Sequence, residues 1–225
     1  MYTIISGDII SSTSLHPEHK KLLRNRLQAL LEDLDRDFSV YGRIIKGDYI
    51  ECYVPNVQDA MQVLLAIKSY VKAIPVDISN YDTKQRRAKS FREYGIRLAL
   101  GFGNMQQIDI EEGILDGEAI YMSGRMINST ATHNTKRITI KNTLFFVSKD
   151  EQLNSKWEAI LGLVDVLLSK ATSRQSEVLY LRLTGASEKN ISERLGIDQS
   201  VVNRHSTSVG WNAIEGVVDY FRKTF

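Results

Sequence analysis

The segment from Ser173 to His205 constrains the fold most, because it has the pattern of a helix-turn-helix. Such a unit needs a short helix, a tight turn and a second helix packed across the first. Gly196 falls where the turn is tightest, and glycine tolerates the left-handed backbone that ends a helix. Ser192 is small enough for close helix approach. The apolar contacts between the two helices are expected from Ile191, Leu195, Ile197 and Val202.

The second of these helices is expected to present polar side chains outward, namely Gln199, Ser200, Asn203, Arg204, Thr207 and Ser208. Such groups can donate to phosphates or read base edges, so DNA is a predicted partner. From Lys170 onward, eight Lys/Arg stand against six Asp/Glu, a weaker basic excess than a DNA binder normally carries. Dimerisation would double the phosphate contacts; the unit could otherwise assist another factor. The alternative is a three-helix domain with a structural or protein-binding role.

Composition bounds the class of protein. A chain of 225 residues fits one large domain or two smaller ones, and its net charge of +2 says little about partners. The single cysteine, Cys52, lies in an apolar alternating segment and is expected to be buried. With no disulfide framework, no signal-peptide core and no apolar run long enough for a membrane span, a cytoplasmic protein is expected.

Strand-like and helix-like segments alternate through the first part of the chain. We expect a strand at 2–10, a helix from His16 to Phe38, two strands around the Lys46-Gly47-Asp48 turn, a helix over 57–73 ended by Pro75, a strand from Gly95 to Gly103, a turn and helix within 114–132, and a strand from Lys136 to Asn142. This order predicts an α+β sandwich of the ferredoxin-like kind with extra elements.

Two stretches interrupt this order. The pattern dissolves between Pro75 and Glu93, which predicts a solvated, mobile excursion; capture of a polyanion is the alternative, through Lys84, Arg86, Arg87, Lys89 and Arg92. Polar residues between Val147 and Lys156 precede a new helix from Trp157 to Lys170. We therefore predict two domains, residues 1–150 and an all-α helix-turn-helix domain at 151–225.

Two Gly-Asp pairs carry the chemistry of the first domain. Asp8 ends the first strand, and Asp48 lies in the turn between the next two. In a β-α-β-β unit these places lie side by side, and two carboxylates so close repel unless a cation or proton lies between them. Hard oxygen ligands suit Mg²⁺ or Mn²⁺, and Mg²⁺ commonly shares phosphate oxygens with a nucleotide. Opening the predicted helix, Ser11, Ser12 and Thr13 make a plausible phosphate cradle. Alternatively, both aspartates are turn residues.

The motifs GDIISST, RIIKGDYIECY, IRLALGFG and DGEAIYMSGRMIN occur in this order and resemble the catalytic domain of class III nucleotidyl cyclases, over roughly residues 1–145. With its C-terminal QSVVN and GWNAI, the whole chain resembles the bacterial SatD family. Its last part is also similar to LuxR-type and sigma-factor DNA-binding helices.

The cyclase resemblance implies that Asp8 and Asp48 hold metal ions and that Arg125 stabilises charge on the transition-state phosphate. It also implies a head-to-tail homodimer. Ile44 stands where cyclases have a purine-reading lysine, and Tyr121 stands where they have an asparagine. The resemblance thus implies that the metal half of the site is kept and that substrate reading is lost.

These observations favour a DNA-binding transcriptional regulator with a degenerate cyclase-like domain that senses a metal ion and a nucleotide. The first alternative is an enzyme, a divergent nucleotidyl cyclase or other nucleotide-processing catalyst, targeted by its helix-turn-helix. The second is an interaction scaffold without a metal site.

Overall fold

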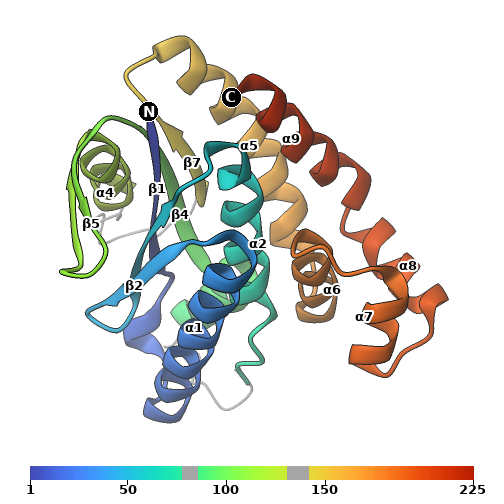
Figure 1. Cartoon of the computed structure of the whole chain (residues 1–225). Coiled ribbons are helices and arrows are strands. Elements are labelled where there is room, and N and C mark those ends of the chain that lie inside the picture. Colours follow the sequence, from blue (N-terminus) through green and yellow to red (C-terminus); the bar gives the residue numbers. More distant parts are fainter. Residues whose placement is uncertain (78–85, 131–141) are drawn as a thin grey trace.

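A computed structural model describes residues 1–77, 86–130 and 142–225 (Figure 1). Within these ranges, five strands form one sheet in the order β2-β3-β1-β4-β7. β7 pairs with β4 in parallel, and the other neighbours are antiparallel. The order β4-β1-β3-β2 is that of a ferredoxin-like unit, so the predicted α+β fold is confirmed. The strands are β1 Tyr2–Ile9, β2 Tyr41–Ile45, β3 Tyr49–Val54, β4 Ile96–Gly103 and β7 Leu144–Val147.

Helices cover both faces of this sheet. α1 (Pro17–Phe38) and α2 (Ala60–Ala73) lie on one face, and α4 (Glu118–Thr130) lies on the other (Figure 1). α1 begins with a proline, Pro17, at its first position, where the N–H that proline lacks would have no partner within the helix. Its leucines at helical spacing are buried against the sheet, which confirms the amphipathic pattern: Leu23, Leu27, Leu30, Leu31 and Leu34.

Three strands were not predicted, among them β7 (Leu144–Val147), because the last strand was expected at Lys136–Asn142. Residues 114–117, expected to be a turn, instead form β6 (Ile114–Gly117), which pairs with β5 (Met105–Asp109) in a separate two-stranded sheet. Both strands are short and carry few apolar residues, so the sequence shows no clear strand pattern. A guanidinium nitrogen of Arg43 donates to the carbonyl oxygen of Gly113, which ties the tip of this hairpin to β2.

The interruption predicted between Pro75 and Glu93 is only partly correct. Residues 86–94 form a helix, α3 (Arg86–Tyr94), whose Phe91 is buried in the main core. This single large apolar contact anchors a segment that is otherwise charged, so periodicity could not reveal it. Lys84 and most of the strand predicted from Lys136 to Asn142 lie outside the described residues.

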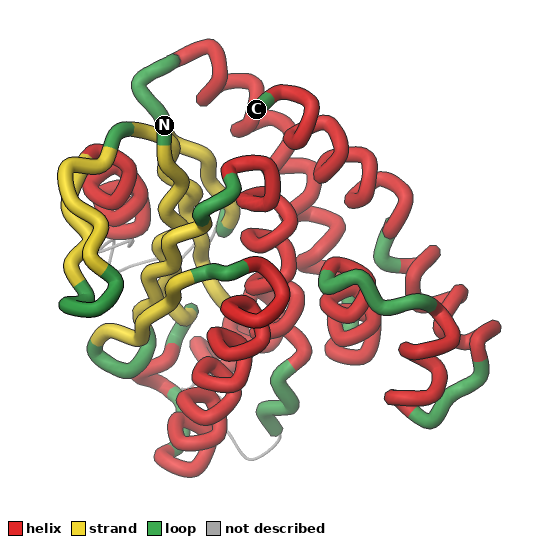
Figure 2. Tube along the Cα trace, viewed as in Figure 1, coloured by secondary structure: helices red, strands yellow, loops and turns green. Residues whose placement is uncertain are grey.

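The C-terminal helices are α5 (Glu151–Lys170), α6 (Ser173–Leu183), α7 (Glu188–Leu195), α8 (Gln199–Ser208) and α9 (Trp211–Thr224) (Figure 2). α5 begins earlier than the predicted Trp157, because the side chain of Asp150 accepts hydrogen bonds from the first turn. The aromatic rings of Phe146 in β7, Trp157 in α5 and Phe221 in α9 pack together, with their ring centroids no more than 6.5 Å apart. The apolar core therefore runs from the sheet into the C-terminal helices.

Two simpler expectations are also settled. Cys52 is a buried free thiol, as its apolar surroundings predicted. Among the described residues, no helix combines the length and apolar character needed to cross a membrane.

Candidate functional site

Asp8, near the end of β1, and Asp48, in the turn just before β3, lie beside each other at one end of the sheet. Asp8 pairs with Tyr49 across the β1–β3 ladder, and the backbone N–H of Ile9 donates to the carbonyl oxygen of Asp48 at 3.0 Å. The turn before β3 has left-handed backbone at Lys46 (φ 53°) and Gly47 (φ 86°), which reverses the chain and returns Asp48 beside β1. The side-by-side placement expected for a β-α-β-β unit is thus present.

Both carboxylates line one cavity of about 660 Å³ between the sheet and α4. Arg125 of α4 lines the same cavity, as does Lys46 of the hairpin turn. The arginine therefore faces the two aspartates of its own chain. Tyr49, Glu51, Tyr121 and Asn128 also line this cavity, so it offers aromatic surface and hydrogen-bonding groups beside the charged ones.

Asp8 has an unusual electrostatic environment. Burial raises the pKa of its carboxyl to about 6; Arg97 opposes the rise, and the negative charge of Asp48 adds to it. The guanidinium of Arg97 lies 4.0 Å from the Asp8 carboxylate. A second cation beside both aspartates would remove their repulsion and favour the ionised form of Asp8.

The donor set fits a hard divalent cation that keeps other oxygen ligands. The described residues contain no cluster of three or more His, Cys, Asp or Glu side chains that could enclose a metal ion. Two carboxylates are nevertheless sufficient protein ligands for Mg²⁺, because it retains waters and takes phosphate oxygens from its substrate. Asp8 and Asp48 would hold such an ion, and the open cavity leaves room for a phosphate-bearing partner.

Ser11, Ser12 and Thr13 are not in the first turn of α1, which corrects their predicted place at the start of that helix. They lie in and just before a separate 3-10 turn (Ser12–Ser14), and α1 starts only at Pro17. The N–H groups of Ser14 and Leu15 are used inside this turn, so they are not free for an anion. Pro17 takes the helix start because its fixed φ suits that position.

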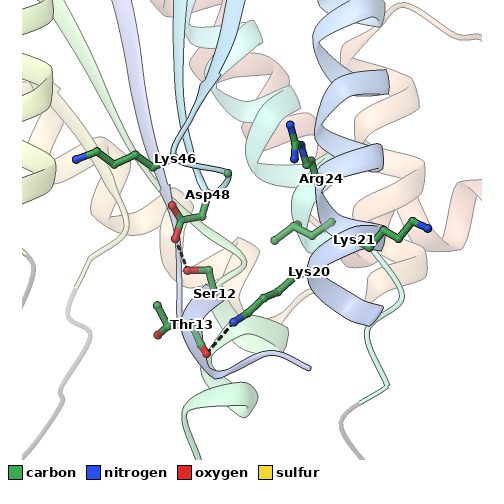
Figure 3. Close-up of a pocket in the computed structure, with 9 residues that line it drawn as sticks. Ser12, Thr13, Lys20, Lys21, Arg24, Lys46 and Asp48 are labelled. Carbon is green, nitrogen blue, oxygen red and sulfur yellow. Dashed lines mark hydrogen bonds between the residues drawn. The ribbon is translucent and has the colours of Figure 1, made fainter. Parts of the chain in front are cut away.

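Ser12 instead supports Asp48. Its buried hydroxyl donates to the Asp48 carboxylate at 2.5 Å (Figure 3). Ser12 and Thr13 line a second cavity, on the α1 side of the hairpin turn, whereas Ser11 lines neither cavity. Asp48 borders both cavities, and its orientation is set by Ser12.

Close packing positions α4 and its Arg125. The Ser123 hydroxyl is 2.7 Å from that of Ser6 in β1. At Gly101 in β4, an added Cβ would overlap the carbonyl oxygen of Ala119, so only glycine lets this helix approach the strand. Tyr121, which also lines the cavity, donates its hydroxyl to Asp116.

Two contributors to the site were missed from the sequence. Arg97 pairs with Asp8 in the β1–β4 register, and Glu51 is bound by Arg43 at 2.6 Å on the same hairpin that carries Asp48. The strand register places Arg97 opposite Asp8 and Glu51 opposite Arg43. The signal that could have found them is the register between strands, which a single sequence does not provide.

In the C-terminal part, helices α7 and α8 are joined by a tight turn. Gly196 ends α7 with left-handed backbone (φ 62°), and the Ser192 hydroxyl donates to the carbonyl oxygen of Ile197 at 2.5 Å. Ile191 and Val202 are buried between the helices. The polar residues of α8 proposed to meet DNA are all exposed on its surface: Gln199, Ser200, Asn203, Arg204 and Thr207.

Comparisons with known proteins add little to this description. No family model matches the chain. No curated protein matches it either. Among solved structures, it is similar to the adenylyl cyclase CyaB from P. aeruginosa, with 13% sequence identity and a TM-score of 0.36 over 57% of this chain and 71% of that one. The site is therefore argued from its own residues.

Proposed function

We propose that this chain is a transcriptional regulator that binds a divalent cation and a nucleotide between Asp8 and Asp48 and binds DNA through a helix-turn-helix formed by α7 and α8. One observation carries the proposal: the cavity lined by Asp8, Asp48 and Arg125 combines acidic cation ligands with a phosphate-binding guanidinium. Membership of the SatD family, action in the cytoplasm and assembly as a homodimer are parts of the same proposal.

Each group has a role in binding. Asp8 and Asp48 bind the cation, which supplies neutralising charge to the phosphates. Ser12 holds the Asp48 carboxylate in place through its hydrogen bond. Arg125 and Lys46, on opposite walls of the cavity, donate to phosphate oxygens. Arg97 keeps part of the negative charge of Asp8 compensated when no ligand is bound.

Helix α1 provides a physical connection between ligand and DNA. Lys20 and Arg24, in the first turns of α1, line the second cavity, which Asp48 also borders. Near its other end, Asp33 accepts a hydrogen bond of 2.9 Å from Tyr180 of α6. A helix of this length is about 30 Å long and moves largely as one body. A shift of α1 on ligand binding would therefore reach the helices that carry α8.

The DNA-binding half is supported by the exposed polar face of α8, with Asn203 and Arg204 at its centre. A recognition helix in the major groove contacts base edges through such residues. The C-terminal helices carry only a modest excess of basic residues, and phosphate contacts dominate affinity for DNA. We therefore propose that two copies of the chain bind one DNA site together.

Thermal unfolding of the full chain tests ligand binding. We expect Mg²⁺ or Mn²⁺ together with at least one of the four common nucleoside triphosphates to raise the melting temperature, because a ligand at a hundred times its Kd adds about 2.7 kcal/mol of stability. Asp48→Asn should abolish the metal-dependent part of the shift. Glu112→Gln, which removes an exposed acid on the β5–β6 hairpin, should leave it unchanged.

DNA binding is measured by fluorescence anisotropy with a random-sequence duplex at fixed low salt. The titration is done with and without the nucleotide that stabilises the chain. Binding that changes with the nucleotide supports a regulator. A chain that no nucleotide stabilises, and that binds no duplex, contradicts the proposal and leaves the interaction scaffold.

A specific observation also favours an enzyme as the second candidate. Arg125 lines the same cavity as both aspartates of its own chain, where it would stabilise negative charge developing on a phosphoryl group. Incubation with each nucleoside triphosphate and Mn²⁺ or Mg²⁺, followed by chromatography, tests this candidate. Turnover that disappears in Arg125→Ala, while nucleotide binding persists, would favour the enzyme. Unchanged nucleotides after prolonged incubation would favour the regulator.

A further inference from the structure

A second cavity, of about 450 Å³, opens between the β2–β3 turn and the start of α1 (Figure 3). Its walls carry four cationic side chains, Lys20, Lys21 and Arg24 from α1 and Lys46 from the turn, and only one acidic side chain, Asp48. A neighbouring cavity of about 610 Å³ continues along the same wall past Arg24 and Lys46 to Arg43. The surface on this side of the turn is thus strongly basic.

These cations lack acidic partners. Within the described ranges, no carboxylate pairs with Lys21, Arg24 or Lys46, and Lys20 donates only to the carbonyl oxygen of Thr13, at 3.1 Å. Farther along α1, Arg36 is paired with two aspartates. In α1, the positive charge of Arg36 near the C-terminal end is therefore paired with carboxylates, whereas the positive charges of Lys20, Lys21 and Arg24 near the N-terminal end are not.

The uncompensated charges repel one another. Lys20 and Arg24 are four residues apart on a helix, so they share a face, and like charges at this spacing destabilise the helix. Lys46 lines the same cavity from the hairpin turn, where it has left-handed backbone, and its side chain extends away from α1 (Figure 3). A bound anion would relieve this repulsion, whereas water only screens it.

We propose that this basic cavity binds a chain of several phosphates, such as the polyphosphate tail of a nucleotide or free inorganic polyphosphate. This inference rests on the proposed function. It states that the phosphate chain of the nucleotide extends from the Asp8–Asp48 cavity into the basic cavity and binds there. It adds Lys20, Lys21 and Arg24 to the site, whereas Lys46 lines both cavities.

The arrangement of the cations distinguishes a phosphate chain from a single phosphate. In Figure 3, the side chains of Lys46 and Lys21 extend in opposite directions, each away from the space between the turn and α1, and Arg24 lies on the helix between the turn and Lys21. One phosphate reaches one or two of these groups, whereas a chain reaches along the row. Asp48 borders both this cavity and the one lined by Arg125, so a cation held there would touch phosphates on either side.

Isothermal titration calorimetry of the full chain tests the proposal with inorganic tripolyphosphate and orthophosphate as probes, each with and without Mg²⁺. We expect one tripolyphosphate per chain and at least tenfold weaker binding of orthophosphate. Arg24→Gln and Lys46→Gln should each weaken tripolyphosphate binding by about tenfold, because charge-assisted hydrogen bonds contribute at this level. Both residues are exposed, and circular dichroism will verify that the variants fold.

A charge-matched control separates this site from general attraction. The double variant Lys170→Gln/Lys189→Gln removes two exposed charges from the C-terminal helices and should bind tripolyphosphate like the unaltered chain. Equal losses in this control and in Arg24→Gln/Lys46→Gln would overturn the proposal, as would the absence of any tripolyphosphate binding.

Adding ATP as a third probe distinguishes the two sources of the phosphate chain. ATP binding that exceeds tripolyphosphate binding, and that weakens in Arg24→Gln, supports the nucleotide source; the reverse order supports inorganic polyphosphate. ATP binding that depends on Asp48 and not on Arg24 overturns this inference and leaves the proposed function standing. Phosphate-chain binding that depends on Arg24, without any effect of nucleotides on DNA binding, supports this inference and contradicts the regulator.

Discussion

The ammonium group of Lys68 in α2 lies 3.5 Å from the carboxylate of Asp165 in α5, and both side chains are buried. Lys68 also donates to the carbonyl oxygens of Tyr94 and Ile96, each at 2.8 Å. Asp165 accepts hydrogen bonds from the backbone and the hydroxyl of Thr143. This network joins the helix on the sheet to the first C-terminal helix, next to the point where the chain enters β7.

Removing one partner of this pair should be costly. Lys68→Met leaves a buried carboxylate without its counter-charge, and we expect the free energy of unfolding to fall by about 3–5 kcal/mol. Urea denaturation measures the change. Asp165→Asn in the Lys68→Met background should restore part of the loss, because the amide is neutral and still accepts from Thr143. Equal stability of Lys68→Met and the unaltered chain would show that the pair contributes nothing net.

Stability should rise with pH in the alkaline range. Burial lowers the pKa of Lys68 and of Lys72 from 10.5 to about 8. Between these values the unfolded chain binds more protons than the folded one, so the free energy of unfolding increases with pH from about 8 to about 10. Above that, Tyr94 acts in the opposite sense, because its pKa is raised to about 12, chiefly by burial. Chemical denaturation at pH 8, 9 and 10 would detect the rise, and Lys68→Met should reduce it.

The sequence predicted strands β1 to β4 of the main sheet because they and the helices beside them have strong periodicity, whereas β7 (Leu144–Val147) follows the strand expected at Lys136–Asn142. Leu23, Leu27 and Leu30 repeat at helical spacing in α1, and the Lys46-Gly47-Asp48 turn separates two strands whose side chains alternate. Those local signals do not depend on distant contacts. They were enough to predict that Asp8, near the end of β1, and Asp48, in the turn before β3, lie side by side.

Other features depend on tertiary contacts and could not be predicted. β5 and β6 are short strands that form a separate two-stranded sheet, and α3 is held by the buried Phe91 and by Lys68 and Lys72, which donate to its last carbonyl oxygens. Ser12 was expected at the start of α1, but a separate 3-10 turn precedes the helix and directs its hydroxyl to Asp48. The basic cavity combines α1 with a turn that follows it in sequence, and only the folded chain brings them together.

Packing of α4 should depend on the absence of a side chain at residue 101. In Gly101→Ala, the new methyl group would collide with the carbonyl oxygen of Ala119 and approach the Cβ of Ser123 to 3.1 Å. We expect α4 to shift, the free energy of unfolding to fall by about 1–3 kcal/mol, and nucleotide binding to weaken as Arg125 moves. Differential scanning calorimetry and titration with nucleotide measure the two effects.

Gly162→Ala provides the matched control for Gly101→Ala. Gly162 lies within α5, and nothing would lie within 4 Å of an added Cβ. The substitution should therefore stabilise the chain by about 0.4–1 kcal/mol, because alanine loses less backbone entropy on folding. A Gly101→Ala variant as stable as this control would contradict the close approach of α4 to β4.

The Tyr180–Asp33 hydrogen bond should carry part of the coupling between ligand and DNA. Tyr180→Phe removes the hydroxyl, costs about 1 kcal/mol of stability and leaves both binding sites intact. The expected result is a smaller effect of nucleotide on DNA affinity, with nearly unchanged affinity for each ligand alone. Anisotropy titrations with and without nucleotide measure this difference. Full coupling in Tyr180→Phe would exclude α1 as the connection.

Arg204 provides the sharpest test of the exposed face of α8. In the proposed DNA complex its guanidinium contacts a base edge or a phosphate, so Arg204→Ala should weaken duplex binding by about 1–3 kcal/mol if the contact is to a base. Arg174→Ala removes an equally charged side chain from α6, where Arg174 pairs with Glu177 at 2.7 Å, and should have little effect. Affinity measured at several salt concentrations separates the two kinds of contact, because loss of a phosphate contact lowers the salt dependence by about one ion. If both variants bind duplex like the unaltered chain, α8 does not face DNA.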